Sequence, residues 1–283
     1  MNKIEFLRPI SIKGKIRIGK KHDGGYVVYG KNLDSVDVLL AYGVGWDTDF
    51  EEKFNEQTGK EVFMFDPTML KGEQIIDRSA LFQLIFQFQL RRATEYFYWA
   101  KDWKLKLEKL NSKGVHFVNE GISTKGETKY NTLGCHIEKY GLTNKRLLLK
   151  MDIENAEYDI FLDDSTYIHL QNVTQIIIEW HNLKNRLRDL GQILNRLKQD
   201  FEVVHIHGNN YGGTFVLYNF MSNNQEDMVL PDVLEMLLVR RNDILPEDYS
   251  TDVERYPIAD LDYPNNPHNK ELAADFCNSF MSP

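Results

Sequence analysis

The sequence predicts an α/β fold in which a doubly wound, mostly parallel sheet carries one helical insertion. Short apolar runs, of the kind that fill strands buried on both faces, recur along the chain and alternate with segments of helical periodicity. A glycine turn follows one of these runs and an acid ends the next, as in a βαβ unit. With 283 residues, of which 42% are hydrophobic, the chain can form one substantial core. We therefore expect a single domain over residues 1–283.

The overall charge and the cysteine content exclude several classes of protein. A formal net charge of -8 argues against general affinity for nucleic-acid phosphates or acidic membranes. Cys135 and Cys277 provide no disulfide framework and no cysteine zinc site, which fits a reducing compartment. The segment 1–6 lacks the apolar region of a signal peptide, and no apolar run approaches the roughly 18 residues that span a bilayer. These features predict a cytoplasmic protein.

The first 30 residues predict a hairpin. Two short strands flank Asp23-Gly24-Gly25, a strong turn signal. One interpretation is the hairpin alone. The other is that Asp23 and the bare glycine backbone approach a ligand, because glycine permits close contact.

The apolar segment 36–42 predicts a buried strand that runs into Gly43 and Gly45. Such glycines let the backbone turn sharply and come near a ligand, and a helix is expected to begin near Phe50. A second buried strand, 61–65, ends at Asp66, about twenty residues further on, where an acid typically takes ribose hydroxyls.

The dinucleotide fingerprint expects a third glycine, and Thr48 stands in its place. This absence favours an adenosine cofactor without a pyrophosphate, such as S-adenosylmethionine, over NAD.

Residues 69–112 interrupt the alternation with a segment that is rich in aromatic residues and free of Pro and Gly from residue 73 onward. Because βα connections are usually short, we predict a helical insertion here. It either packs on the sheet or forms a lid or a dimer surface, since so many aromatic side chains are costly to expose.

A third strand, 115–118, restores the alternation, and Glu120, Gly121 and Ile122 follow its carboxyl end, where an adenine ring would rest. A helix is expected from Asn131 to Tyr140, with Gly141 ending it.

The stretch 147–158 is the most informative. Lys150, Asp152 and Glu154 interrupt its apolar run at a spacing of two, so they share one face of a strand near its carboxyl end. A Lys–Asp ion pair at the start of the next helix would explain them structurally. We favour a catalytic or ligand-binding edge, because charges in a buried strand are costly unless paired or used.

The fifth strand, 173–181, places Glu179 and His181 on one face at its carboxyl end, and a basic amphipathic helix follows over 187–197. Residues 201–210 and 213–218 predict a hairpin of final strands, in which His205 and His207 alternate with apolar neighbours. A further strand is expected over 233–241. Acid and imidazole groups on neighbouring strand ends indicate a functional site.

These residues together resemble a known family. The segment Lys150 to Tyr158 is similar to the "LKIDIEGAE" signature of FkbM-type S-adenosylmethionine-dependent methyltransferases, with Asn155 where the family usually has glycine. Asn tolerates the left-handed region, so we expect the local geometry to survive. The resemblance also covers Asp23 to Tyr26, Tyr42 to Gly45, Phe65 to Thr68, Gly121 to Ser123, Glu179 with His181, His207 with Asn209 and Asn210, and Leu261 to Asn265.

The resemblance implies a seven-stranded Rossmann-like methyltransferase sheet and methyl transfer from S-adenosylmethionine to a hydroxyl of a sugar or natural-product scaffold, as in capsule or other glycan pathways. Cofactor contacts are then expected from Asp23, Tyr26, Gly43, Gly45, Asp66, Glu120, Gly121 and Ile122.

A sugar hydroxyl needs a base or a metal to lose its proton. His181 is the first candidate base, held by Glu179 or Asp152, with His207 as its rival. Alternatively, Asp152, Glu179 and His181 hold Mn²⁺ or Mg²⁺. The competing hypotheses are an NAD-dependent oxidoreductase and a non-catalytic nucleotide-binding or scaffold protein that uses the aromatic insertion as its working surface, where a homo-oligomer would also form.

Overall fold

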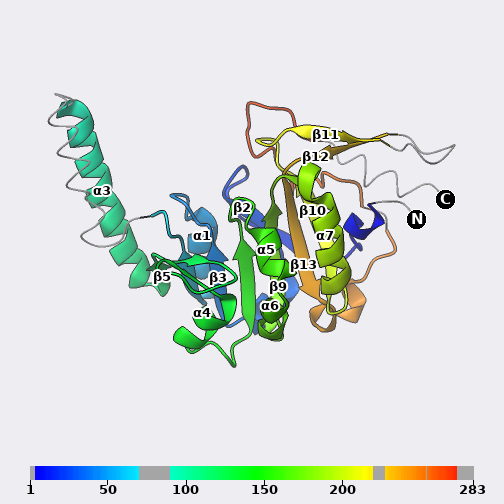
Figure 1. Cartoon of the computed structure of the whole chain (residues 1–283), viewed down its shortest axis with the longest axis horizontal. Coiled ribbons are helices and arrows are strands. Elements are labelled where there is room, and N and C mark those ends of the chain that lie inside the picture. The colour runs from blue at the N-terminus through cyan, green and yellow to red at the C-terminus, as the bar shows by residue number, and fades with distance from the viewer. Residues whose placement is uncertain (1–3, 70–89, 219–226, 253, 273–283) are drawn as a thin grey trace.

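A seven-stranded sheet forms the centre of the computed structural model, which describes residues 4–69, 90–218, 227–252 and 254–272 (Figure 1). In order across the sheet, the strands are β10 (Phe201–Gly208), β13 (Leu234–Arg240), β9 (Val173–Trp180), β8 (Leu147–Met151), β3 (Val38–Tyr42), β4 (Glu61–Phe65) and β5 (Val115–Val118). Only β13 among them runs antiparallel to its neighbours, β9 and β10. The predicted doubly wound, mostly parallel Rossmann-like sheet of seven strands is confirmed.

The pairing of β10 corrects one prediction. Residues 201–208 do not form a hairpin with 213–218, because β10 pairs with β13, while β11 (Thr214–Leu217) pairs with β12 (Met228–Pro231) outside the main sheet. The side chains of β11 are exposed or half-buried, whereas β13 is buried on both faces from Leu234 to Val239. The more apolar strand therefore takes the internal position.

Two layers cover the sheet, each with its own core. On one face lie the predicted hairpin, β1 (Lys15–Gly19) with β2 (Gly25–Tyr29), and the helices α1 (Asp49–Thr58) and α3 (Leu90–Asn111). On the other face lie α4 (Leu133–Lys139), α5 (Glu157–Leu162), α6 (Asp164–His169) and α7 (Leu183–Leu197) (Figure 1). Helices on both faces explain why the parallel strands read as continuous apolar runs.

The remaining elements are short. A third small pair of strands consists of β6 (Gly121–Ile122) and β7 (Tyr130–Asn131). Connections in the described ranges also contain the 3₁₀ helices η1 (Glu5–Leu7), η2 (Gly30–Ser35), η4 (Arg241–Asp243) and η5 (Pro246–Asp248).

The insertion is helical where the structure describes it. Helix α3 extends away from the sheet, and its buried residues include Ala100, Trp103 and Leu110 (Figure 1). Tyr98 and Trp99 are exposed. Core packing therefore accounts for the part of α3 nearest the sheet. The first half of the predicted insertion, residues 70–89, lies outside the described residues, and the lid and dimer hypotheses stay predictions.

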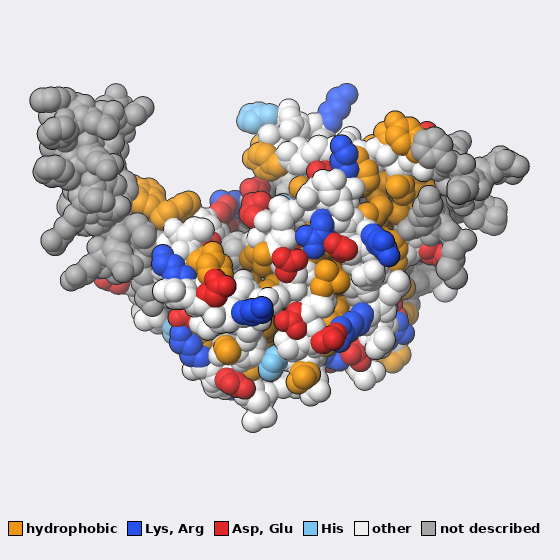
Figure 2. All heavy atoms as spheres, viewed as in Figure 1, with side chains coloured by type: hydrophobic (Ala, Val, Ile, Leu, Met, Phe, Trp, Pro, Cys, Tyr) orange, Lys and Arg blue, Asp and Glu red, His pale blue; other side chains and the backbone are white. Residues whose placement is uncertain are grey.

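The surface also bears on two expectations. Figure 2 shows acidic and basic side chains intermixed over the described residues of the face that carries α4 to α7, so this face has no broad basic surface of the kind that attracts nucleic acid. Within the described parts of the chain, no helix combines the length and apolarity needed to cross a membrane.

Candidate functional site

A cavity of about 530 Å³ opens where β3, β4 and β8 end. This is the carboxyl edge of the parallel strands, where open α/β sheets bind their ligands. Most of the residues predicted to contact a cofactor line it: Asp23, Tyr26, Gly43, Gly45, Asp66, Gly121 and Ile122. The fold therefore brings together predicted residues that are far apart in the chain.

The glycine turn is shaped by its backbone. Gly43 has a φ of +73°, and a Cβ at this position would lie 1.6 Å from the carbonyl oxygen of Asp152. Gly45 has a φ of +59° and donates its backbone N–H to Oδ2 of Asp66 across 2.8 Å. Oδ1 of Asp66 accepts from the backbone N–H of Thr68 at 2.8 Å. The buried Asp66 carboxylate is thus held in a fixed orientation at the cavity wall.

Glu120, the remaining cofactor prediction, does not line the cavity. Its side chain forms an ion pair with Lys139 and accepts a hydrogen bond from Asn131 at 2.9 Å. It also lies 3.4 Å from Nε2 of His136. Burial lowers the pKa of His136 to about 4 although Glu120 opposes this, so the ring is neutral at neutral pH.

Four charged or polar side chains meet on the β8 side of the cavity, across β3 from Asp66. The hydroxyl of Tyr26 donates to Oδ2 of Asp152 at 3.1 Å. Nζ of Lys150 lies 4.8 Å from the centre of the Tyr26 ring and 3.4 Å from Oε1 of Glu51. All four residues line the cavity. The interpretation of Lys150 as the ion-pair partner of Asp152 is therefore incomplete, because its nearest carboxylate is on α1.

His181 lies at the centre of a group of carboxylates. Its Nε2 is 3.4 Å from Glu179, 3.8 Å from Asp152 and 3.6 Å from Glu154, and its Nδ1 is 3.0 Å from Oε1 of Glu157. The structure thus brings Asp152, Glu179 and His181 together as predicted. Asp152 lines the cavity, whereas Glu179 and His181 do not.

The charges in this group follow from its burial. Burial disfavours the imidazolium of His181, but hydrogen bonds to Glu157 and Glu179 outweigh this and raise its pKa to about 11. Burial raises the pKa of Glu179 to about 8, against the opposing effect of His181. Burial also raises the pKa of Asp152. At neutral pH the ring of His181 is therefore protonated, and its two N–H groups face several carboxylates. It cannot accept a further proton.

The same group is suited to a divalent cation. Asp152, Glu157 and His181 each offer one ligand atom within 4.8 Å of the others. Two carboxylates and an imidazole are a donor set that suits Mn²⁺ or Mg²⁺. Glu157 was not among the predicted metal ligands, but it belongs to this group. Glu179, which was predicted as a ligand, is outside the group and contacts Nε2 of His181.

The strand-to-helix turn also fits the prediction for Asn155. Glu154 and Asn155 have φ angles of +55° and +82°, both in the left-handed region. Asn adopts this region more readily than most residues. Asn155 thus takes the left-handed conformation that was expected of it, and the match to the turn of the family stays a prediction.

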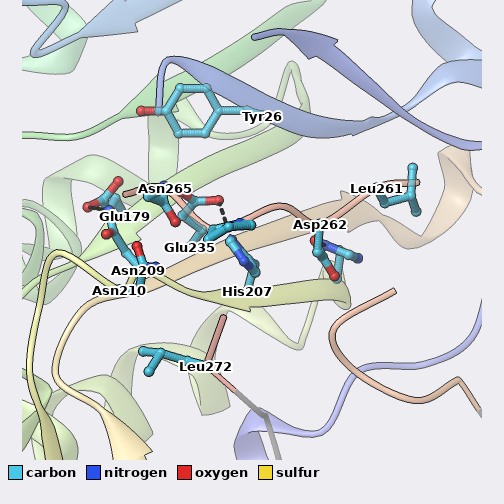
Figure 3. A network of polar contacts seen from close by, with 12 residues as sticks. Tyr26, Glu179, His207, Asn209, Asn210, Glu235, Leu261, Asp262, Asn265 and Leu272 are labelled. Atoms are coloured by element: carbon cyan, nitrogen blue, oxygen red, sulfur yellow. Dashed lines mark hydrogen bonds and ion pairs between the residues drawn. The ribbon is translucent and has the colours of Figure 1, made fainter. Parts of the chain in front are cut away.

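His207 is placed away from this group. Its Nδ1 lies 3.2 Å from Oε2 of Glu235 and its Nε2 3.1 Å from Oε1 of Glu271, and it does not line the cavity (Figure 3). Burial opposes the charge on the ring, but the two carboxylates raise its pKa to about 10. Both ring nitrogens are therefore occupied. Its link to the His181 group runs through the sheet, since Glu235 is the β13 neighbour of Glu179 on β9.

His205, which alternates with His207, has a structural position. Its Nε2 lies 2.7 Å from Oδ1 of Asp262, and both side chains are buried. Burial lowers the pKa of His205 despite the carboxylate, so this contact holds the C-terminal segment with a neutral ring at neutral pH.

Sequence reasoning missed two carboxylates of this region, Glu51 and Glu157. Both lie in the first turn of a helix that follows a strand end. An acid in a first helical turn is common because it interacts well with the helix dipole, so its presence alone is no functional signal.

Comparisons with known proteins add little to this description. No protein-family model matches the sequence, and no curated protein is similar to it. Among solved structures, the chain is similar to a precorrin-6y C5,15-methyltransferase from Geobacter metallireducens GS-15, with a TM-score of 0.35 and 10% identity over 74% of this chain and 82% of that one. A likeness this weak supports no inference about function.

Proposed function

We propose that the protein is an S-adenosylmethionine-dependent O-methyltransferase that acts on a hydroxyl of a sugar or glycan precursor. The observation that supports it most is the fixed Asp66 carboxylate beside the Gly43 and Gly45 turn, in a cavity at the carboxyl edge of the sheet. In this proposal Asp66 binds the ribose hydroxyls, and Gly121 and Ile122 lie against the adenine.

The charge of the cavity favours this cofactor over NAD. One lysine, Lys150, is found among the described residues of its lining, together with six acids: Asp23, Asp47, Glu51, Asp66, Asp152 and Glu154. An anionic cavity attracts the sulfonium and ammonium groups of S-adenosylmethionine. It repels the pyrophosphate of a dinucleotide, which binding sites of that class meet with a glycine-lined helix start.

Methyl transfer requires an in-line approach of the acceptor oxygen to the methyl carbon, breakage of the carbon–sulfur bond and loss of the hydroxyl proton. Because His181 is already protonated, the group placed to take that proton is Asp152, which lines the cavity. The imidazolium of His181 and the hydroxyl of Tyr26 then hold the Asp152 carboxylate in position.

A metal-assisted route uses the same residues. Asp152, Glu157 and His181 would hold a divalent cation, which lowers the pKa of a bound hydroxyl when present. His181 would have to be neutral to serve as a ligand of that cation. Both routes use Asp152 at the cavity wall and His181 next to it.

Titration calorimetry with S-adenosylhomocysteine tests the proposal. We expect micromolar binding to the wild type, loss of binding in Asp66→Ala, and no change in Glu138→Gln, which alters an exposed acid on α4. NAD is titrated in parallel. Binding of NAD alone would support the oxidoreductase, and binding of neither ligand would reject both enzyme classes in favour of a scaffold.

The acceptor class needs its own assay, because it comes from the family resemblance. We expect transfer of a labelled methyl group to a sugar or sugar-nucleotide fraction. Transfer to protein or to phenolic acceptors only would overturn this part of the proposal and leave the cofactor assignment intact.

A further inference from the structure

We propose that Glu51 and Lys150 bind the zwitterionic amino-acid end of the cofactor. Glu51 binds the ammonium group of the ligand, and Lys150 binds the carboxylate of the ligand. This assignment rests on the proposed function. It concerns two buried side chains that line the cavity, 0% and 3% exposed. The sequence placed Lys150 at a ligand-binding edge without naming its ligand, and it did not single out Glu51.

Glu51 has an unmet demand for hydrogen-bond donors. Neither of its carboxylate oxygens meets hydrogen-bond geometry with a donor, although both are buried. The ammonium of Lys150 lies 3.4 Å away, at the limit of a direct contact. Burial raises the pKa of Glu51 and Lys150 opposes the rise. A buried carboxylate with one long ion-pair contact and no closer donor is incompletely satisfied, and a ligand ammonium would supply shorter hydrogen bonds.

Lys150 is fixed in place by two neighbours from different elements. The centre of the Tyr26 ring on β2 lies 4.8 Å from its Nζ, and Oε1 of Glu51 on α1 lies 3.4 Å from the same atom. An ammonium group has three donors, and these two contacts leave capacity for an anionic ligand group. Lys150 is buried on β8, so its side chain is already ordered before a ligand binds. It therefore loses less side-chain entropy on binding than a surface lysine would.

The location of the pair matches the far end of an adenosyl ligand. Asp66, Gly121 and Ile122 lie toward β4 and β5, on one side of β3 in the sheet. Lys150 belongs to β8, on the opposite side of β3, and Glu51 lies on α1 above it. With adenosine at the β4 side, the aminobutyrate chain extends past Gly43 and Gly45 toward this pair.

A zwitterion suits the pair better than a singly charged group does. In the free protein the two charges lie against each other, which limits the cost of burying either one. A ligand with one charge would satisfy one side chain and leave the other with a weaker partner. A ligand with both an ammonium and a carboxylate completes two charge-assisted contacts at once.

The test compares S-adenosylhomocysteine with 5′-methylthioadenosine, which has the same adenosine thioether but no amino-acid chain. We expect the wild type to bind S-adenosylhomocysteine at least about tenfold more tightly. Glu51→Gln should remove most of this preference and leave the affinity for 5′-methylthioadenosine unchanged. The matched control is Glu56→Gln, an acid on the same helix that pairs with Lys53 outside the cavity.

A second variant guards against misfolding. Glu51→Gln combined with Lys150→Gln removes both charges and leaves no lone buried ion, and thermal unfolding checks each variant. Equal affinity of the wild type for the two ligands, or an equal loss for both in the variants, would overturn the assignment. If neither ligand binds to the wild type, the proposed function itself fails.

Discussion

Nδ1 of His181 lies 3.0 Å from Oε1 of Glu157, the first residue of α5, and the same oxygen accepts the backbone N–H of Ile153 at 2.9 Å. One carboxylate thus connects the end of β9, the turn after β8 and the next helix. This contact opposes the cost of burying the imidazolium and contributes to the raised pKa of His181.

Replacing Glu157 by Gln should change how stability depends on pH. A pKa raised from 6.5 to about 11 gives stability that is complete below pH 6.5 and lost as pH rises through 11. The free energy of unfolding of the wild type should therefore fall between pH 7 and 9, by at most about 1.4 kcal/mol per pH unit. In Glu157→Gln the pKa is lower, so the fall should be smaller above neutral pH.

Urea unfolding at several pH values measures these slopes, and NMR titration of the His181 ring measures the pKa directly. The Glu138→Gln variant serves as control. Parallel pH profiles for wild type and Glu157→Gln would show that this carboxylate does not set the charge of His181.

Addition of Mn²⁺ distinguishes the two routes for proton removal. A metal that binds only the folded state raises the temperature of unfolding. If Asp152, Glu157 and His181 hold it, the shift should be larger at pH 8.5 than at pH 6.5, because binding must displace the imidazole proton. His181→Asn should abolish the shift in thermal scans. No shift at either pH would leave Asp152 as the base without a metal.

The two glycines of the first turn should respond differently to a methyl group. In Gly43→Ala the new Cβ would meet the backbone oxygen of Asp152, so we expect loss of the folded state. At Gly45 a Cβ has no neighbour within 4 Å, and the cost is the left-handed φ alone, about 1–2 kcal/mol. Thermal unfolding of both purified variants measures the difference. Equal destabilisation would contradict the close approach of Gly43 to the turn after β8.

The fold was largely predictable because strands of a parallel sheet are short apolar runs. Leu40, Phe63 and Leu149 are buried members of three such strands, and an apolar run of this kind has few alternative structures. Pairing was less predictable. Periodicity identifies a strand but not its partner, so β10 was assigned to the nearest following segment instead of β13.

The site was predictable where it depends on strand ends. Asp66 and Asp152 follow strands directly, and the geometry of the sheet puts such residues at one edge. The positions of side chains on helices and loops were not predictable, because the direction of such a side chain depends on packing. Glu51 faces the cavity from α1, while Glu120 turns to Lys139, and neither outcome follows from sequence spacing.

Asn210 gives a last prediction, about the C-terminal segment. Its Nδ2 donates to the carbonyl oxygens of Asn266 at 3.0 Å and Lys270 at 3.2 Å, and its Oδ1 accepts from the backbone N–H of Asn266 at 2.6 Å. Figure 3 shows it beside Asn209, whose Nδ2 donates to Oε1 of Glu179 at 3.0 Å. One buried amide therefore holds the segment next to the His181 group.

Asn210→Ala should lower the free energy of unfolding by about 2 kcal/mol, because backbone groups of the segment lose their partners. Hydrogen exchange should rise at Asn266 and its neighbours more than in the central strands. The contacts of Glu271 with His207 and of Asn265 with Glu235 remain in the variant, so the loss of structure should stay local to Asn266. Asn185→Ala, on the exposed side of α7, is the control. An equal rise of exchange across the sheet would mean that Asn210 supports the whole fold, and unchanged exchange would mean that the contacts of Asp262 and Asn265 suffice to hold the segment.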